Sequence, residues 1–419
     1  MSESPSKIIM HLDMDAFFVN VELLHRNCTI DAPVIVAKEG ARSVVLSASY
    51  SARAYGVRSA MPLLRARSLC PQAVIIPPSA DYAQYSQQML NILRSYSSLV
   101  EKISIDEAFV DLSGTVRTLG HPVHTAQQMQ RRIMSELSLP CSIGLGPTKF
   151  IAKMASSASK PHGLWVIEPH QVQEFLDPLP VEKLWGVGSK TQQLLADIGV
   201  RTVSQLREHS RSFLMSRFGT SAGSHLYDIA RGIDLREVIP ERPTKSVGAE
   251  YTFYQDVSSY EQVQQELLKL SLSVGARLRK IGKYASTISI KIRYADFQTV
   301  TRSTSLESIN SGQKIYAVAL EKIRELSVFD SHGFSYRGIR LIGVRAENLR
   351  DVEKGIQCSL FETFSGENYS AESMLCSGNE RWSRAEEIMD QIHERFGSQG
   401  IMPAKLLSPF PLCENHEKS

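Results

Sequence analysis

The hydrophobic pattern at the start of the chain predicts a strand followed directly by a helix. Over residues 7–15 the side chains alternate in two sets, one of them apolar, which is the period of a β-strand. From residue 17 to about residue 24 apolar positions recur at helical spacing. Two carboxylates, Asp13 and Asp15, therefore lie where the predicted strand ends.

A second strand is predicted over residues 142–145. It is followed by a helix that opens near Pro147 and has its apolar positions at helical spacing. Strands that alternate with helices indicate an α/β domain. We expect this domain to span about residues 1–170, with residues 20–79 forming a lobe of their own.

The next part of the chain, up to about residue 233, has the pattern of short helices interrupted by glycines. A P-loop is excluded there because Ser189 separates Gly188 from Lys190, and a Rossmann fingerprint is excluded because its third glycine is absent. The order of helix, Gly-x-Gly turn and helix resembles the helix-hairpin-helix module. Its backbone N–H groups hold a DNA phosphate without reading sequence. We therefore expect Gly186, Gly188 and Lys190 to contact DNA.

Residues 246–345 have the pattern strand, helix, strand, strand, helix, strand. From Ser286 to Tyr294 one alternating set is mostly apolar, and the other is polar and includes Lys291 and Arg293. This pattern predicts an open sheet with two helices on its apolar face. The polar, partly basic face would be free to lie on a nucleic-acid backbone, so Lys291 and Arg293 are candidate DNA contacts.

Composition narrows the class of protein. The chain has 419 residues, enough for about two to four domains. With 42% hydrophobic and 22% charged residues, a largely disordered, collagen-like or transmembrane protein is excluded. We expect no secretion signal, since His11 and Asp13 interrupt the first apolar run. The six cysteines form no C-x-x-C pair, which argues against a zinc site or disulfide framework and favours a reducing, cytoplasmic location.

The net charge of +3 is unevenly distributed along the chain. Residues 242–350 contain 17 Lys or Arg and 10 Asp or Glu, a net charge of +7. Residues 351–419 contain 6 and 12, a net charge of −6, and residues 1–241 contain 24 and 22, a net charge of +2. A basic central block suggests a polyanionic partner, although a charge excess by itself is more often a solvated surface.

Three acidic residues are candidates for chemistry: Asp13 and the adjacent pair Asp106 and Glu107. Carboxylates at strand ends or in turns are hard oxygen ligands that suit Mg²⁺. The alternative is that such acids simply face water. Spacing alone favours that alternative, because neighbouring strand residues point to opposite faces unless a turn or bend intervenes.

Five groups of residues favour the Mg²⁺ site over acids that simply face water. Together and in this order they resemble the Y-family, or translesion, DNA polymerases, and most closely the bacterial DNA polymerase IV branch. They are DMDAFF (13–18), ASYSAR with GVRSAM (48–53 and 56–61), SIDE (104–107), GLGPTK (144–149) and ASKPHG (158–163). The resemblance covers about residues 7–361. Each string is moderately specific, and the ordered set is jointly very specific.

The resemblance implies roles for individual residues. Asp13 and Asp106, with the backbone carbonyl of Met14, would bind two Mg²⁺ ions, and Glu107 would complete the site and position the primer hydroxyl. A second set would hold the incoming nucleotide, with Tyr50, Arg53 and Lys160 on its triphosphate and Phe18 under its sugar as a steric gate. The alternative role for either phenylalanine is that of a core aromatic on an amphipathic helix, and the residues alone do not distinguish Phe17 from Phe18. The family motif selects Phe18 as the gate.

The resemblance also implies an α/β multidomain fold of the right-hand polymerase type. The palm would comprise residues 1–19 and 80–170, the fingers 20–79, the helix-hairpin-helix thumb 171–241 and an α+β little finger 242–350. Residues 351–419 would form an acidic tail. The substrates of the enzyme would be primer-template DNA and dNTPs. The template would be copied with low fidelity and without a proofreading exonuclease. We expect a monomer with no membrane association.

The tail contains a short peptide, residues 357–361, that resembles the segment by which bacterial polymerases bind the sliding clamp. Gln357, Leu360 and Phe361 would be its contacts, the last two filling a preformed pocket. Farther on, residues 382–396 have the pattern of an amphipathic helix, which could pack on the body or bind a partner.

Two other functions remain open on the sequence. The first is a sister Y-family branch that is restricted to one nucleotide or depends on accessory subunits. The second is a DNA-binding repair scaffold without catalysis, since the hairpin and the basic sheet would survive loss of activity. The joint presence of all three acids with Tyr50, Arg53 and Lys160 argues against the scaffold.

Overall fold

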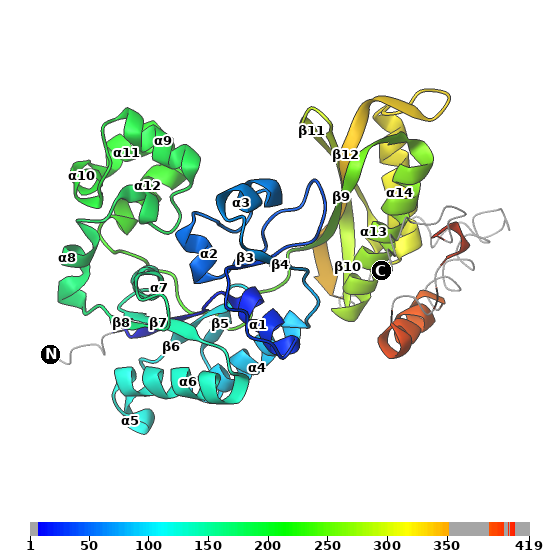
Figure 1. The fold of residues 1–419 in the computed structure, drawn as a ribbon. Coiled ribbons are helices and arrows are strands. Elements are labelled where there is room, and N and C mark those ends of the chain that lie inside the picture. Colours follow the sequence, from blue (N-terminus) through cyan, green and yellow to red (C-terminus); the bar gives the residue numbers. More distant parts are fainter. Residues whose placement is uncertain (1–6, 352–384, 398–400, 402, 407–419) are drawn as a thin grey trace, which may run out of the picture. The chain divides into compact units, whose positions relative to one another are not determined.

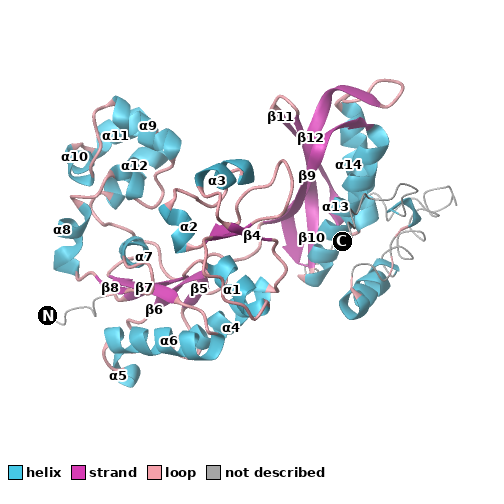
Figure 2. Ribbon diagram, in the orientation of Figure 1, coloured by secondary structure: helices cyan, strands magenta, loops and turns pink. Residues whose placement is uncertain are grey.

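The computed structural model describes residues 7–351, 385–397, 401 and 403–406. The chain divides into two compact units, Met1–Arg242 and Pro243–Ser419, each described here by itself. Figure 2 distinguishes their helices from their strands. None of the helices in the described ranges is both long and apolar enough to cross a membrane.

The first unit contains a five-stranded sheet with strand order β5-β6-β1-β7-β8 (Figure 1). Neighbouring strands are antiparallel, except that β7 and β8 are parallel. The strands are β1 (Ile9–Met14), β5 (Val100–Lys102), β6 (Glu107–Asp111), β7 (Cys141–Gly146) and β8 (Leu164–Val166). The strands predicted over residues 7–15 and 142–145 are therefore confirmed as β1 and β7.

Helices cover both faces of this sheet. α4 (Tyr82–Arg94) and α6 (Pro122–Leu137) pack on one face and α7 (Lys149–Ala158) on the other, while α1 (Phe17–His25) follows β1 and α5 (Val116–Leu119) precedes α6. Because β1 is central and covered on both sides, both of its alternating sets are buried, including His11.

Close packing of α7 on β7 depends on Gly144. A Cβ atom at this residue would lie 2.1 Å from the carbonyl oxygen of Ala152 and 2.2 Å from the backbone nitrogen of Ser156. No side chain fits in that space, so glycine allows the helix to lie directly on the strand. The same helix carries Lys153 to a carboxylate of β6.

Residues 20–79 include a small sheet with its own core. Its strands are β2 (Val34–Val36), β3 (Ser47–Ala48) and β4 (Val74–Ile76), in the order β3-β2-β4. α2 (Tyr50–Ala54) and α3 (Leu63–Leu69) accompany them. Buried residues such as Ile35, Val57 and Leu63 form a cluster separate from the core of the large sheet.

The part of the first unit that follows β8 is helical, as predicted. It contains two 3₁₀ turns, η1 (Pro169–Gln171) and η2 (Val181–Lys183), and the helices α8 (Val172–Leu176), α9 (Ser189–Asp197), α10 (Val203–Glu208), α11 (Arg211–Phe218) and α12 (Thr220–Ile229). Their buried side chains share a cluster with Phe150 and Ile151 of α7. This helical part thus shares its core with the helix that packs on the large sheet.

The second unit has the element order predicted for residues 246–345. It contains β9 (Ser246–Ser259), α13 (Tyr260–Lys280), β10 (Lys283–Tyr294), β11 (Thr299–Ile309), α14 (Gly312–Glu325) and β12 (Phe334–Asp351). The antiparallel sheet has the order β11-β10-β12-β9. Ile288, Ile290 and Ile292 are buried with residues of α13 and α14, which confirms the predicted apolar face.

The mostly apolar set predicted along β10 starts at Ser286, whose side chain is not fully buried. The pairing of β10 with β11 shifts register between Ala285 and Thr287. Ala285 is fully buried, whereas Ser286 is half-buried and donates a hydrogen bond to the backbone of Asn348. The step from Ala285 to Thr287 covers two residues in β10, whereas the paired step from Ile309 to Ser305 covers four, so the extra residues lie in β11. The pairing of β10 with β12 keeps its register at this step.

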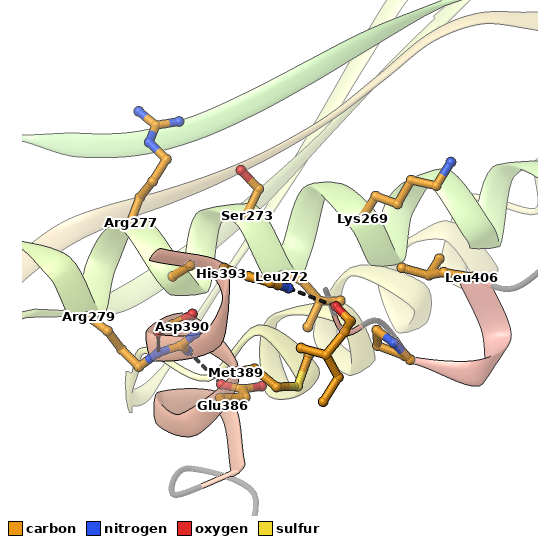
Figure 3. Close-up of a pocket in the computed structure, with 13 residues that line it drawn as sticks. Lys269, Leu272, Ser273, Arg277, Arg279, Glu386, Met389, Asp390, His393 and Leu406 are labelled. Carbon is orange, nitrogen blue, oxygen red and sulfur yellow. Dashed lines mark hydrogen bonds and ion pairs between the residues drawn. The ribbon is translucent and has the colours of Figure 1, made fainter. Parts of the chain in front are cut away.

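The helix predicted over residues 382–396 is described over residues 385–396, and it packs on α13 within the second unit (Figure 3). Its Glu386 accepts hydrogen bonds from the first two backbone N–H groups of α14, at 3.1 and 3.0 Å. Arg279 of α13 pairs with both Glu386 and Asp390. These contacts favour packing on the body, one of the two alternatives left open. The predicted clamp contacts Gln357, Leu360 and Phe361 lie outside the described residues.

Candidate active site

The three predicted acidic residues lie close together at one end of β1 and β6. Asp13 and Glu107 are direct partners across these two antiparallel strands. The backbone N–H of Met14 donates to the carbonyl oxygen of Asp106 at 2.9 Å. Asp106 lies in a bend that ends where β6 begins at Glu107, so the pair is not held to strict strand alternation. A bend of this kind is what Asp106 and Glu107 need in order to serve one site, and spacing alone could not show whether it was present.

Two lysines from α7 and the loop after it bind these carboxylates. The Nζ atom of Lys160 lies 2.6 Å from Oδ1 of Asp13, and Lys153 forms an ion pair with Glu107. All four side chains are at most 23% exposed, so water screens these pairs less than it would at the surface. Lys153 was not among the predicted site residues. The sequence held one indication of its role: Lys153 lies one helical turn after Lys149, the last residue of the GLGPTK motif.

Burial raises the pKa of Asp13, Lys160 lowers it in part, and the nearby charges of Asp106 and Glu107 raise it again. At Glu107 burial also raises the pKa, but the interactions with His11 and Lys153 outweigh it, and the pKa is about 2. Glu107 is therefore ionised at neutral pH. Its charge acts on the neighbouring carboxyl of Asp13 and raises the pKa of that group.

His11 lies beneath this group and is fully buried. Its Nδ1 atom is 2.7 Å from Oγ of Ser156, and its Nε2 atom is 3.4 Å from Oε2 of Glu107, a long contact that is weak as a hydrogen bond. Burial lowers the pKa of His11 to about 4, against the opposing effect of Glu107, so the ring is neutral at pH 7. Sequence patterns assigned His11 only to a strand and did not identify it as part of this site.

The acidic cluster suits a hard divalent cation by the chemistry of its donors. Asp13, Asp106 and Glu107 offer carboxylate oxygens, which Mg²⁺ prefers, and no sulfur ligand is among them. As they stand, the residues described by the structure contain no group of three or more acidic, histidine or cysteine side chains arranged to hold a metal. The oxygens of Asp13 and Glu107 instead contact lysine ammonium groups.

The residues predicted to hold a triphosphate come from two parts of the first unit. Tyr50 begins α2, where the Ser49 side chain caps the helix, and its hydroxyl donates to Oδ1 of Asp15 at 2.7 Å. Arg53 lies on the same helix with its guanidinium 4.9 Å from the centre of the Tyr50 ring. Lys160 follows α7 and binds Asp13. The structure thus links Tyr50 and Lys160 to two acids at the end of the same strand.

The two adjacent phenylalanines have different surroundings. Phe17 is 2% exposed and packs in the core of the large sheet. Phe18 is half-buried, with its ring 4.7 Å from that of Tyr82 in an edge-on arrangement. The hydroxyl of Tyr82 donates in turn to the buried carboxylate of Glu22. Phe18 is therefore the ring with a free side, and its partner ring is itself held in place.

The predicted DNA contacts of the first unit lie at the start of α9. Gly186 has φ +103°, a conformation that favours glycine, and Gly188 precedes the helix as its N-cap. Lys190 is exposed in the first turn. The first backbone N–H groups of a helix have no acceptor within it, so this turn can bind an anion.

In the second unit, Lys291 and Arg293 lie on the strand set opposite the buried isoleucines. Lys291 is paired with Glu250 of β9, its Nζ atom lying 2.9 and 3.0 Å from the two carboxylate oxygens. Arg293 donates to the hydroxyl of Thr299 at 2.9 Å. Lys291 is therefore a partly neutralised cation, a feature that the alternating pattern could not reveal.

Comparisons with known families match three parts of the chain. Residues 12–157 match the impB/mucB/samB family, and residues 244–360 match the C-terminal domain of that family. Residues 182–234 match a family described as the thumb domain of DNA polymerase-iota. Along the chain, the first match covers the acidic cluster, the thumb match covers the glycine turn, and the C-terminal match covers the four-stranded sheet.

Whole-chain relatives agree with these matches. DNA polymerase IV of Desulfatibacillum aliphaticivorans is 38% identical over 403 residues, which is 96% of this chain and 97% of that protein. DNA polymerase IV of Bacillus velezensis is 34% identical over 402 residues, 94% of this chain and 92% of that protein.

Among solved structures, the Y-family DNA polymerase chimera Dbh-Dpo4(243-245)-Dbh matches with a TM-score of 0.73 and 25% identity, covering 82% of this chain and 99% of the other. This likeness and the thumb match confirm the predicted right-hand architecture of palm, fingers, helical thumb and little finger. The chain therefore belongs to the Y-family of translesion DNA polymerases, within its DNA polymerase IV group, and is a metal-dependent, DNA-directed DNA polymerase.

Proposed function

We propose that the chain extends a primer by adding dNTPs to its 3′-hydroxyl at the site formed by Asp13, Asp106 and Glu107. The observation that carries this proposal is the direct pairing of Asp13 with Glu107 across two strands, beside the backbone of Asp106. The oxygen donors of the three acids, with the backbone carbonyl of Met14, would hold two Mg²⁺ ions. When bound, the ions would activate the attacking hydroxyl and stabilise the leaving pyrophosphate.

The protein's own groups would position both reactants. Glu107, ionised because Lys153 and His11 lower its pKa, would face the primer hydroxyl. Tyr50, Arg53 and Lys160 would hold the triphosphate, since its oxygens need donors and cations on the side away from the carboxylates. The ammonium of Lys160 would then exchange Asp13 for a phosphate oxygen.

DNA would be held on two surfaces that carry no catalytic group. In the first unit, Gly186, Gly188 and Lys190 at the start of α9 would hold a backbone phosphate. In the second unit, Lys291 and Arg293 would contact the backbone from the open face of the sheet, with Lys291 leaving Glu250 for a phosphate. Neither surface reads base identity, which suits synthesis on damaged templates.

The proposal keeps the subdomain boundaries predicted from the sequence. These are residues 1–19 and 80–170 for the palm, 20–79 for the fingers, 171–241 for the thumb and 242–350 for the little finger. None of the four is assigned to an exonuclease, so synthesis would proceed without proofreading. We also propose that the enzyme is a cytoplasmic monomer that binds the sliding clamp through residues 357–361.

The test is substitution of the acids. Asp13→Ala or Asp106→Ala should abolish primer extension in Mg²⁺ buffer and leave DNA affinity, measured by fluorescence anisotropy, nearly unchanged. Asp111→Asn is the matched control. Asp111 is the last residue of β6, whereas Glu107 is its first, so the control lies on the same strand but far from the acidic cluster. Extension at wild-type rates by either alanine variant would refute the assignment and would favour a non-catalytic DNA-binding scaffold.

A further inference from the structure

Asp15 is a buried carboxylate that the proposed mechanism does not use. It follows the end of β1 and is 2% exposed. Its Oδ1 atom accepts a hydrogen bond from the hydroxyl of Tyr50 at 2.7 Å, and its Oδ2 atom accepts one from the backbone N–H of His162 at 2.7 Å. The hydroxyl of Ser142 lies 3.0 Å from both oxygens. A buried carboxylate is stable only when its oxygens are bonded in this way.

The donors come from three elements that are distant in sequence. Tyr50 begins α2 in the lobe of residues 20–79, Ser142 lies in β7, and His162 lies two residues beyond Lys160 in the loop after α7. Two of these elements carry groups of the proposed triphosphate site. One buried acceptor thus ties the helix of Tyr50 and the loop of Lys160 to the end of the strand that carries Asp13.

We propose that Asp15 is a positioning residue for the incoming nucleotide, and that it sets the distance between Tyr50 and Lys160 before the triphosphate arrives. This inference rests on the proposed roles of Tyr50 and Lys160. It also distinguishes the two acids of the first motif. Asp13 keeps an exchangeable partner in Lys160, whereas the two oxygens of Asp15 are already bonded by three donors, of which the Ser142 hydroxyl is shared between them.

The substitution Asp15→Asn tests this geometry with little change in volume. An amide has one acceptor oxygen and one NH₂ donor. If the NH₂ group replaces Oδ2, it faces the N–H of His162, which cannot reverse its polarity. If it replaces Oδ1, the Tyr50 hydroxyl can only accept from it, and a hydrogen bond to a charged carboxylate becomes one between neutral groups. Either choice removes the charge-assisted hydrogen bond that holds one of the two elements.

The readout is equilibrium binding of a dNTP to the enzyme on a primer that ends in a dideoxynucleotide, so that no chemistry follows. We expect Asp15→Asn to weaken dNTP binding about tenfold, the effect of losing one hydrogen bond to a charged group. Affinity for the primer-template alone should stay within about twofold of wild type. In extension assays, KM for dNTP should rise more than kcat falls.

A matched control separates positioning from simple loss of stability. Glu101 of β5 is another buried carboxylate, 2% exposed, which binds Lys149 and Arg242 and touches none of the proposed nucleotide contacts. Glu101→Gln should lower the melting temperature without weakening dNTP binding by the folded enzyme. If Asp15→Asn behaves in the same way, Asp15 is only structural and the inference is wrong.

Tyr50→Phe and Lys160→Ala distinguish failure of the inference from failure of the proposed function. If neither variant weakens dNTP binding, the proposed triphosphate site is wrong. If both weaken it and Asp15→Asn does not, only the inference fails. In the double variant of Asp15→Asn with Tyr50→Phe, the two losses should be less than multiplicative because they share one hydrogen bond. Multiplicative losses would refute the link between Asp15 and Tyr50.

Discussion

At the scale of the single residue, the site separates neighbours of the same chemical type. Asp13 is partly exposed and paired with a lysine, whereas Asp15 is enclosed by hydrogen-bond donors. Phe17 is a core residue, whereas Phe18 has a free side next to Tyr82. In both pairs the difference comes from what packs around each side chain.

The first prediction concerns sugar selection. Phe18→Ala should raise ribonucleotide incorporation by orders of magnitude and reduce deoxynucleotide incorporation much less. The proposed reason is that the ring fills the volume a 2′-hydroxyl needs, and the Tyr82 ring beside it, bonded to Glu22, prevents relaxation. Primer extension with each nucleotide pool measures the ratio.

Phe17→Ala is the control for this prediction. Its truncation should cost on the order of 3 to 5 kcal/mol of unfolding free energy, because the ring lies in the core, and should leave sugar preference unchanged. If Phe17→Ala admits ribonucleotides and Phe18→Ala does not, the gate has been assigned to the wrong ring.

At the scale of the element, polar side chains join the ends of helices that are distant in sequence. Glu22 of α1 accepts hydrogen bonds from the backbone N–H groups of Ser79 and Ala80, at 2.6 and 2.8 Å, just before α4. In the second unit, Glu386 of the tail helix binds the first turn of α14 in the same way. Each carboxylate fixes where one element meets another.

The second prediction is an acid-dependent loss of stability at Glu22. Burial raises its pKa, but hydrogen bonds from Ser79, Tyr82 and Ala80 outweigh burial and lower the pKa to about 2. Since this lies below the ordinary value of 4.5, the carboxylate stabilises the fold above pH 4.5. That stabilisation, about 3 kcal/mol, is lost as the pH falls from 4.5 towards 2.

Thermal unfolding of wild type and Glu22→Gln between pH 7 and pH 3 checks this prediction. The amide cannot gain or lose a proton in this range. The gap in melting temperature between the two proteins should therefore be widest at neutral pH and should narrow with acidification. A gap that stays constant over the whole range would contradict it.

The third prediction concerns the tail helix of residues 385–396. Glu386→Ala should speed hydrogen exchange at the amides of Gly312 and Gln313, because they lose a buried acceptor worth about 1 to 3 kcal/mol. Exchange measured on the full chain by NMR or mass spectrometry reports this directly. Glu387→Ala, at the exposed neighbour, should leave both amides protected. Unchanged protection in Glu386→Ala would mean that the tail helix does not cap α14.

At the scale of the whole molecule, charge is distributed unevenly along the chain. The acidic cluster lies in the first unit, residues 242–350 carry a net charge of +7, and residues 351–419 carry −6. A net charge of −6 disfavours binding to DNA phosphates, which carry the same sign. The proposed task of the tail, binding the clamp, is therefore separable from catalysis.

The fourth prediction follows from this separation. Deleting residues 357–361 should leave distributive synthesis on short primers intact and remove stimulation by the sliding clamp, since no catalytic residue is touched. An equal deletion of residues 367–371 is the control, and it should keep the stimulation. Equal stimulation of both deletion variants in a clamp-loaded extension assay would place the docking site elsewhere.

Some features of this protein follow from the sequence alone. The order of strands and helices in both units follows from local periodicity, because side-chain period reports backbone geometry within a few residues. Membership of the polymerase family follows from short strings in a fixed order. The same periodicity places Asp13 and Glu107 at strand ends, but it does not show that β1 and β6 pair and bring them together.

Tertiary structure alone decided which side chains meet. Lys160 reaches Asp13 across 147 residues, and Lys153 and His11 converge on Glu107. The register shift between β10 and β11 and the position of the tail helix on α13 likewise depend on neighbouring elements. Periodicity carries no information about such distant contacts, which arise only when packing places the faces of different elements against one another.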